Sequence, residues 1–215
     1  MKITKHEHAC IVLEELGQQL VIDPGEFMQR PPTGLHDVIG IVVTHKHPDH
    51  LGLAHVKALA AAYPQMVVFA PQDVLDELHE LPVSKVAVTG GASQTCGSFE
   101  LDFYGHDHAV VYQRVPCQNV GLVVNKHFYY PGDSFVLPEA AAIDVLAVPA
   151  GAPWMKMQEA IEFVHAVKPK VAFATHDGLF NDFGLAIAKN WLVQAVESVD
   201  GAYADLGIGD SYELK

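Results

Sequence analysis

The sequence predicts an α/β fold that forms one domain. Apolar runs with the length of strands alternate with helical patterns along the whole chain. The 215 residues are 50% hydrophobic, which provides enough apolar surface for one well-filled core. No Pro/Ser-rich linker and no low-complexity tract interrupts the alternation. We therefore expect a single domain over residues 1–215.

Short apolar runs bounded by Gly, Pro or Asp predict the strands. In chain order they cover residues 11–13, 20–22, 38–43, 67–70, 86–88, 99–104, 120–124, 127–130, 145–148, 171–174 and 202–206. The run from Val38 to Val43 carries no charge and is rich in β-branched residues, as expected for a strand buried on both faces.

Apolar residues at three- and four-residue spacing predict the helices, over residues 49–63, 72–80, 156–167 and 184–199. Asp49 would open the first of these helices, where a carboxylate suits the positive end of the helix dipole. Strands and helices interleave in both halves of the chain, which indicates two similar halves in one compact unit.

The densest group of polar side chains runs from His45 to His50, directly after the predicted strand 38–43. His45 and His47 point to one side of an extended segment, so both imidazoles can reach one ion at about 2.0–2.1 Å. Pro48 ends the strand, and the turn that follows directs Asp49 and His50 toward a second position. The spacing therefore predicts two adjacent metal sites.

Other predicted strands also end in His or Asp, and α/β folds place their chemistry outside the carboxyl ends of strands. Strand 20–22 leads into Asp23, strand 99–104 into His106 and His108, strand 127–130 into Asp133, and strand 171–174 into His176. Seven groups can be divided between two ions with Asp133 bridging them: His45, His47, Asp49, His50, His108, Asp133 and His176.

The His-x-His-x-Asp-His pattern at residues 45–50, together with the later His, Asp and His, closely resembles the metallo-β-lactamase-fold hydrolases over almost the whole chain. The resemblance implies a four-layer αββα sandwich, with two mixed sheets flanked by helices. It also implies a ligand set. The first ion takes His45, His47 and His108; the second takes Asp49, His50 and His176; Asp133 bridges.

Further segments resemble the small branch of that superfamily that includes relatives of L-ascorbate-6-phosphate lactonase. These segments cover residues 8–10, 22–25, 131–134, 152–154 and 176–178.

Four residues near the predicted site have two interpretations each. His108 is preferred over His106 as a ligand, which leaves His106 as a contact behind the ligands or with the substrate. Asp23 either hydrogen-bonds a ligating imidazole or only shapes a turn. His8 either lines the pocket or lies on an exposed edge strand, and Trp154 either forms a pocket wall or packs in the core.

The predicted activity is dinuclear metal-dependent hydrolysis of a small-molecule ester, lactone or phosphate ester. Two cations about 3.5–4 Å apart can hold a bridging hydroxide and polarise the electrophile, and Asp49 would orient the nucleophile and manage its proton. No serine with a His-Asp partner and no glycine-rich phosphate loop competes with this mechanism. All candidate ligands are nitrogen or oxygen donors, so zinc is the default, with manganese or iron as alternatives.

Charge and cysteine content bound the partners and the compartment. Thirteen Lys+Arg against 26 Asp+Glu give a net charge of −13, which disfavours nucleic acid. A nuclease or phosphodiesterase of the same superfamily is one alternative, and a non-catalytic metal-binding or redox module is the other. Three widely spaced cysteines fit a reducing cytoplasm, and no apolar segment predicts a membrane span. The physiological substrate and the oligomeric state do not follow from the sequence.

Overall fold

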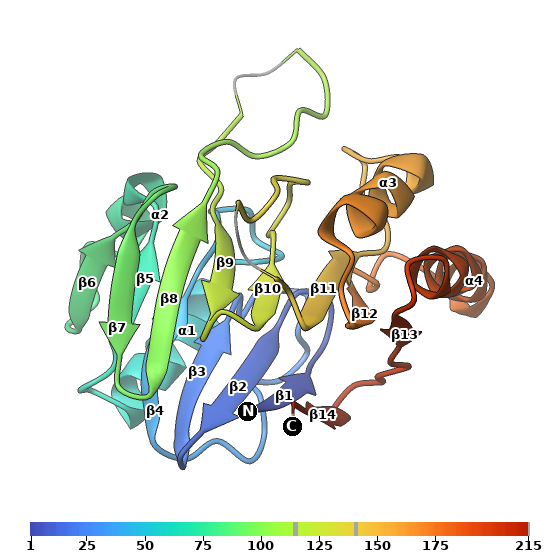
Figure 1. Ribbon diagram of the computed structural model, residues 1–215. Helices are drawn as coiled ribbons and strands as arrows, with labels where there is room; N and C mark the ends of the chain where they lie inside the picture. The colour runs from blue at the N-terminus through green and yellow to red at the C-terminus, as the bar shows by residue number, and fades with distance from the viewer. Residues whose placement is uncertain (114–115, 140–141, 215) are drawn as a thin grey trace.

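The computed structural model describes residues 1–113, 116–139 and 142–214, and within them two seven-stranded sheets lie face to face (Figure 1). The first sheet has the order β14-β1-β2-β3-β4-β5-β6. Its strands are β1 (Lys2–Lys5), β2 (Ile11–Glu15), β3 (Gln18–Ile22), β4 (Val38–Val42), β5 (Val67–Ala70), β6 (Ser84–Ala87) and β14 (Ser211–Glu213). Pairing is antiparallel from β14 to β3 and parallel from β3 to β6, so this sheet is mixed.

The second sheet has the order β13-β12-β11-β10-β9-β8-β7. Its strands are β7 (Ser93–Cys96), β8 (Phe99–Tyr104), β9 (Gly121–Val124), β10 (Phe128–Tyr130), β11 (Val145–Pro149), β12 (Val171–Thr175) and β13 (Ala202–Tyr203). It is parallel from β10 to β13 and antiparallel from β7 to β10. Both sheets are therefore mixed, as the resemblance implied.

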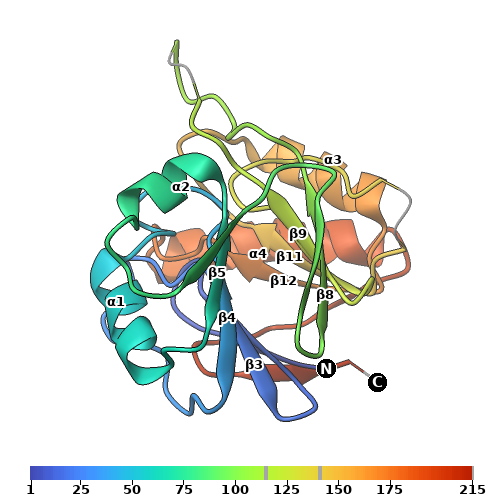
Figure 2. The same ribbon diagram turned by 90° about the vertical axis from the view of Figure 1, so that its left-hand side faces the viewer.

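Three apolar clusters hold four layers together. Leu20 and Leu122 belong to the cluster between the sheets. The outer face of the first sheet packs on α1 (Leu53–Ala62) and α2 (Gln72–Glu77), whereas that of the second packs on α3 (Met157–Val167) and α4 (Asp182–Glu197). Figures 1 and 2 show the two helix pairs on different sides of the molecule. The predicted four-layer αββα sandwich is confirmed.

Most predicted strands are present, but β1, β7 and β14 were not predicted. Their sequences, Lys-Ile-Thr-Lys, Ser-Gln-Thr-Cys and Ser-Tyr-Glu, contain few large apolar residues. β7 and β14 lie at sheet edges, where one side of a strand needs no partner. The last predicted strand, 202–206, is shortened to Ala202–Tyr203. Hydrophobic runs therefore identified the inner strands better than the edges.

The prediction that Asp49 opens a helix is wrong. Asp49 lies in a turn, and α1 begins only at Leu53. The turn is held from outside, because Gly52 N donates to Pro24 O at 3.0 Å. A Cβ on Gly25 would lie 1.8 Å from Asp49 O, so the two loops touch through their backbones. Asp49 is therefore placed by the loop after β3 and not by a helix dipole.

The predicted convergence of strand ends is observed. The loops that follow β3, β4, β8, β10 and β12 carry Asp23, His45, His108, Asp133 and His176, all buried. Among the residues that the structure describes, no helix combines the length and the apolar character required to span a bilayer.

Candidate metal centre

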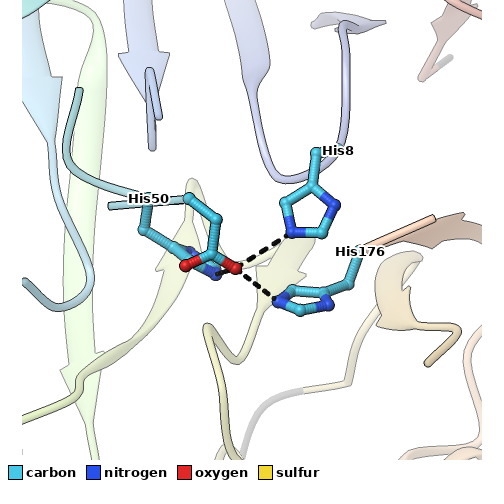
Figure 3. Close-up of side chains that lie close together, drawn as sticks. His8, His50 and His176 are labelled. Atoms are coloured by element: carbon cyan, nitrogen blue, oxygen red, sulfur yellow. Dashed lines mark hydrogen bonds and ion pairs between the residues drawn. The ribbon is translucent and has the colours of Figure 1, made fainter. Parts of the chain in front are cut away.

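The loops after the strands bring histidines and aspartates together in two adjacent groups. The first group consists of His45, His47, His108 and Asp133; the second group consists of His8, Asp49, His50 and His176. Within each group, one nitrogen or oxygen atom per residue lies within 4.8 Å of the others. All seven residues predicted as ligands are present in these groups, and His8 is added to the second. Figure 3 shows the imidazoles of His8, His50 and His176 converging.

Asp133 belongs to the first group and also contacts the second, with one oxygen toward the histidines of each group. Its Oδ1 is 3.1 Å from His50 Nε2 and 3.3 Å from His176 Nε2. Its Oδ2 is 3.2 Å from His108 Nε2 and 3.9 Å from His45 Nε2. This placement is the one required of a carboxylate shared by two ions.

Hydrogen bonds to Nδ1 set the protonation of four of the imidazoles. His108 Nδ1 is 2.5 Å from Ala109 O and His176 Nδ1 is 2.8 Å from Gly151 O. A carbonyl oxygen only accepts, so each of these Nδ1 atoms carries the hydrogen. The lone pair of a neutral ring is then on Nε2, the atom that faces the group centre.

Hydrogen bonds to Asp23 and Thr44 likewise place the hydrogen of His50 and His45 on Nδ1. His50 Nδ1 donates to Asp23 Oδ2 at 2.6 Å. The Thr44 hydroxyl donates to that same oxygen at 2.6 Å, so its own oxygen is free to accept from His45 Nδ1 at 3.1 Å. Asp23 is fully buried and also accepts from Thr44 N at 2.7 Å. It therefore supports the ring of His50 and fixes its tautomer.

Several buried atoms at the centre make no hydrogen bond, although one of them lies within ion-pair distance of two others. They are His45 Nε2, His50 Nε2, His176 Nε2 and Asp133 Oδ1. A buried polar atom without a partner costs free energy, and native structures contain few of them. Imidazole nitrogens and a carboxylate oxygen are suitable ligands for a divalent transition metal. The residues present therefore fit metal ions at both groups.

The pKa values of two histidines also favour positive charge at the centre. Burial lowers the pKa of His176, but the nearby carboxylates of Asp133 and Asp49 outweigh it and raise that pKa to about 9. For His50, too, burial lowers the pKa, and the carboxylates of Asp133 and Asp23 raise it further than burial lowers it. Without a metal, protons balance the buried carboxylates; a divalent cation would replace those protons.

Trp154 contacts the shared carboxylate directly. Its Nε1 donates to Asp133 Oδ2 at 2.7 Å, and its indole packs edge-on against Phe135 at a centroid distance of 5.2 Å. Trp154 therefore packs against an aromatic residue and also reaches the carboxylate at the centre.

His106 lies outside both groups. Its side chain is 60% exposed, and its Nδ1 is 2.8 Å from Asp107 Oδ1. An extended segment would place His106 on the same side as His108, but β8 ends at Tyr104 and Gly105 turns the chain with φ +75°. His108 is buried and belongs to the first group.

Two residues that contact the metal centre, Cys117 and Thr44, were not identified from the sequence. The sulfur of Cys117 lies 3.8 Å from His47 Nε2, at the edge of the first group. A backbone hydrogen bond from His108 N to Cys117 O, 3.0 Å long, holds Cys117 beside the first group. No spacing pattern could have indicated Cys117. Thr44 could have been found, since a hydroxyl directly before the first histidine at a strand end can support that ring.

Comparison with known proteins gives matches along most of the chain. A family model described as a beta-lactamase superfamily domain matches residues 2–176. Protein Rv0786c of Mycobacterium tuberculosis is 33% identical over 186 residues, which cover 83% of this chain and 85% of the relative. A UPF0173 metal-dependent hydrolase of Carboxydothermus hydrogenoformans is 28% identical over 195 residues, which cover 82% and 84% of the two chains.

Solved structures share the fold at low sequence identity. Igni18, a metallo hydrolase from Ignicoccus hospitalis, has a TM-score of 0.77 at 19% identity and covers 100% of this chain and 99% of its own. CmlA, a diiron β-hydroxylase from Streptomyces venezuelae, has a TM-score of 0.77 at 16% identity, covering 99% of this chain and 54% of its own.

Proposed function

The chain belongs to the beta-lactamase superfamily, and from that premise we propose that it is a dinuclear hydrolase of small-molecule esters, lactones or phosphate esters. That it is a metal-dependent hydrolase follows from its relatives, which bear that name over most of the chain. The observation that carries the dinuclear proposal is the set of buried donor atoms around Asp133 that lack a hydrogen-bonding partner.

Each ion would have its own ligands and share one. His45, His47 and His108 would hold the first ion, Asp49, His50 and His176 the second, and Asp133 both. When bound, such ions supply a water activated at neutral pH and positive charge that stabilises the developing oxyanion. Nitrogen and oxygen donors make zinc the default. Manganese and iron belong in the same test, iron because CmlA is described as a diiron protein.

Asp49 is the carboxylate best placed to manage a proton. Its side chain is 18% exposed, against 4% for Asp133. Its contacts with His8 and His176, at 3.1 and 3.2 Å, both use Oδ2. Oδ1 makes neither of these contacts, so it would be the oxygen that takes a proton from the attacking water, which is the role of a general base.

A cavity next to His8 is large enough for a small molecule, and none of the seven proposed metal ligands lines it. Its volume is about 760 Å³, within the range of about 300–1,000 Å³ that is typical of ligand pockets. Apolar side chains such as Phe27 and Leu185 line it together with Glu7 and Asp210. These carboxylates and the net charge of −13 oppose a polyanion, so they disfavour the nuclease alternative.

The test combines metal analysis with hydrolysis of ester, lactone and phosphodiester panels. We expect about two ions per chain in the wild type and loss of both metal and activity in His47→Ala and Asp133→Ala. His106→Ala is the matched control, because this exposed histidine lies outside both groups. A wild type that binds less than one ion and hydrolyses no member of the panels with added zinc, manganese or iron would refute the proposal.

A further inference from the structure

We infer that His8 is a hydrogen-bond donor that positions Asp49, and not an additional imidazole ligand, although its ring lies within the second group. This inference rests on the proposed function, because it assigns a role to a side chain at the proposed metal centre. His8 is 2% exposed, in the loop between β1 and β2.

The neutral tautomer of His8 is opposite to that of four other buried imidazoles at the centre. Gly178 N lies 3.1 Å from His8 Nδ1. A backbone N–H only donates, so Nδ1 accepts and carries no hydrogen. The hydrogen of the neutral ring is therefore on Nε2. In His45, His50, His108 and His176 it is on Nδ1.

His8 Nε2 then has one natural partner. It lies 3.1 Å from Asp49 Oδ2, a carboxylate oxygen that accepts the hydrogen. To ligate a metal, Nε2 would need its lone pair, so Nδ1 would have to be protonated against the N–H of Gly178. Two facing hydrogens are repulsive, and the donor role is the one that satisfies every atom.

The surroundings leave the ring little freedom to change partners. His8 has a left-handed backbone (φ 57°), and its carbonyl accepts from His176 N at 3.0 Å. Its ring lies 4.0 Å from that of His176 and 4.7 Å from that of Phe27, measured between centroids. A Cβ on Gly178 would come within 3.0 Å of His8 Nδ1, so this approach depends on glycine.

The donor role leaves the second ion with fewer protein ligands. Asp49, His50, His176 and the shared Asp133 would bind it, and a further imidazole would occupy a position needed by substrate or water. Catalytic sites differ from structural ones in keeping such a position open. His8 would instead hold Asp49 Oδ2 in place and leave Oδ1 for proton transfer, which makes His8 a positioning residue.

A magnetic resonance experiment separates the two roles without turnover. The full chain is prepared with labelled histidine nitrogens and loaded with an NMR-active cadmium isotope, and His8→Gln identifies the His8 signals. We expect metal–nitrogen coupling at Nε2 of the ligating histidines, and at His8 a proton on Nε2 without such coupling. Coupling at His8 would overturn this inference alone. Absence of coupling at every histidine would refute the metal centre, and with it this inference.

Metal content and kinetics give an independent check. We expect His8→Ala to retain the wild-type metal content, whereas His50→Ala loses one ion. With metal saturating, His8→Ala should reduce kcat by about 10–100-fold, the range found when an outer partner of a ligand is removed. His8→Gln, which keeps an N–H donor, should recover part of it. Loss of one ion in His8→Ala, as in His50→Ala, would contradict the donor role.

Discussion

The first and second groups contain the same residue types but are supported differently. In the first group, His45 and His108 donate from Nδ1 to neutral oxygens, the hydroxyl of Thr44 and the carbonyl of Ala109. In the second group, His50 donates to the carboxylate of Asp23, and Asp49 adds a carboxylate of its own. A carboxylate behind an imidazole raises its basicity. Negative charge is therefore concentrated on the second group, and Asp133 joins the two.

The largest loss of metal and activity is expected at Asp133, because both groups share this residue. Asp133→Ala removes an oxygen from both groups at once. Both ions should be lost. Activity should fall by more than about 100-fold, which is the upper range for removing a residue that only hydrogen-bonds a metal ligand. Elemental analysis and a hydrolysis assay measure this. Retention of one ion per chain would show that one group holds its metal without Asp133.

Removing one histidine from each group should separate them. His50 is fully buried between Asp23 and Asp133, whereas His47 is more exposed, at the edge of the first group. His50→Ala removes the histidine partner shared by two buried carboxylates, which costs about 3–5 kcal/mol, so Tm of the metal-free protein should fall by about 6–20 °C. His47→Ala should leave that Tm nearly unchanged. Equal melting temperatures in calorimetry would contradict the electrostatic difference.

A milder change at Asp23 tests the contribution of charge alone. Asp23→Asn keeps an oxygen that can accept from His50 Nδ1 but removes the negative charge. We expect affinity for the second ion to weaken by about 10–100-fold while the first ion is affected less. Metal titration with a competing chelator measures both. An equal loss at the two sites would mean that Asp23 acts through the fold of the loop.

The smallest effect is expected from Trp154. Trp154→Phe removes the N–H that donates to Asp133 Oδ2 but keeps the contact with Phe135. One hydrogen bond to a charged group contributes about 1.5–3 kcal/mol. A water molecule that replaces the indole N–H should restore part of this free energy. We therefore expect kcat/KM to fall by about tenfold or less, with the metal content unchanged. Loss of an ion from this variant would give Trp154 a larger role than a single donor.

The sequence alone was sufficient for the inner strands other than β1 and for the residues that converge at strand ends. Apolar runs mark where buried strands stop, and polar side chains directly after them must gather at one edge. It was insufficient where loops from distant strands meet. The turn at Asp49 depends on its contact with Gly25, and the tautomer of His8 depends on Gly178. These contacts have no local signature, and neither does the return of Cys117 toward His47.

The contact between the loop after β3 and the turn at Asp49 also limits how this molecule can be redesigned. A Cβ on Gly25 would meet Asp49 O at 1.8 Å, and one on Gly52 would meet Pro24 O at 2.6 Å. Both obstacles are backbone, which cannot rotate away. Libraries that seek new activities should therefore keep these two positions constant and vary Gln29 and Ile208 instead, two exposed residues that line the cavity next to His8.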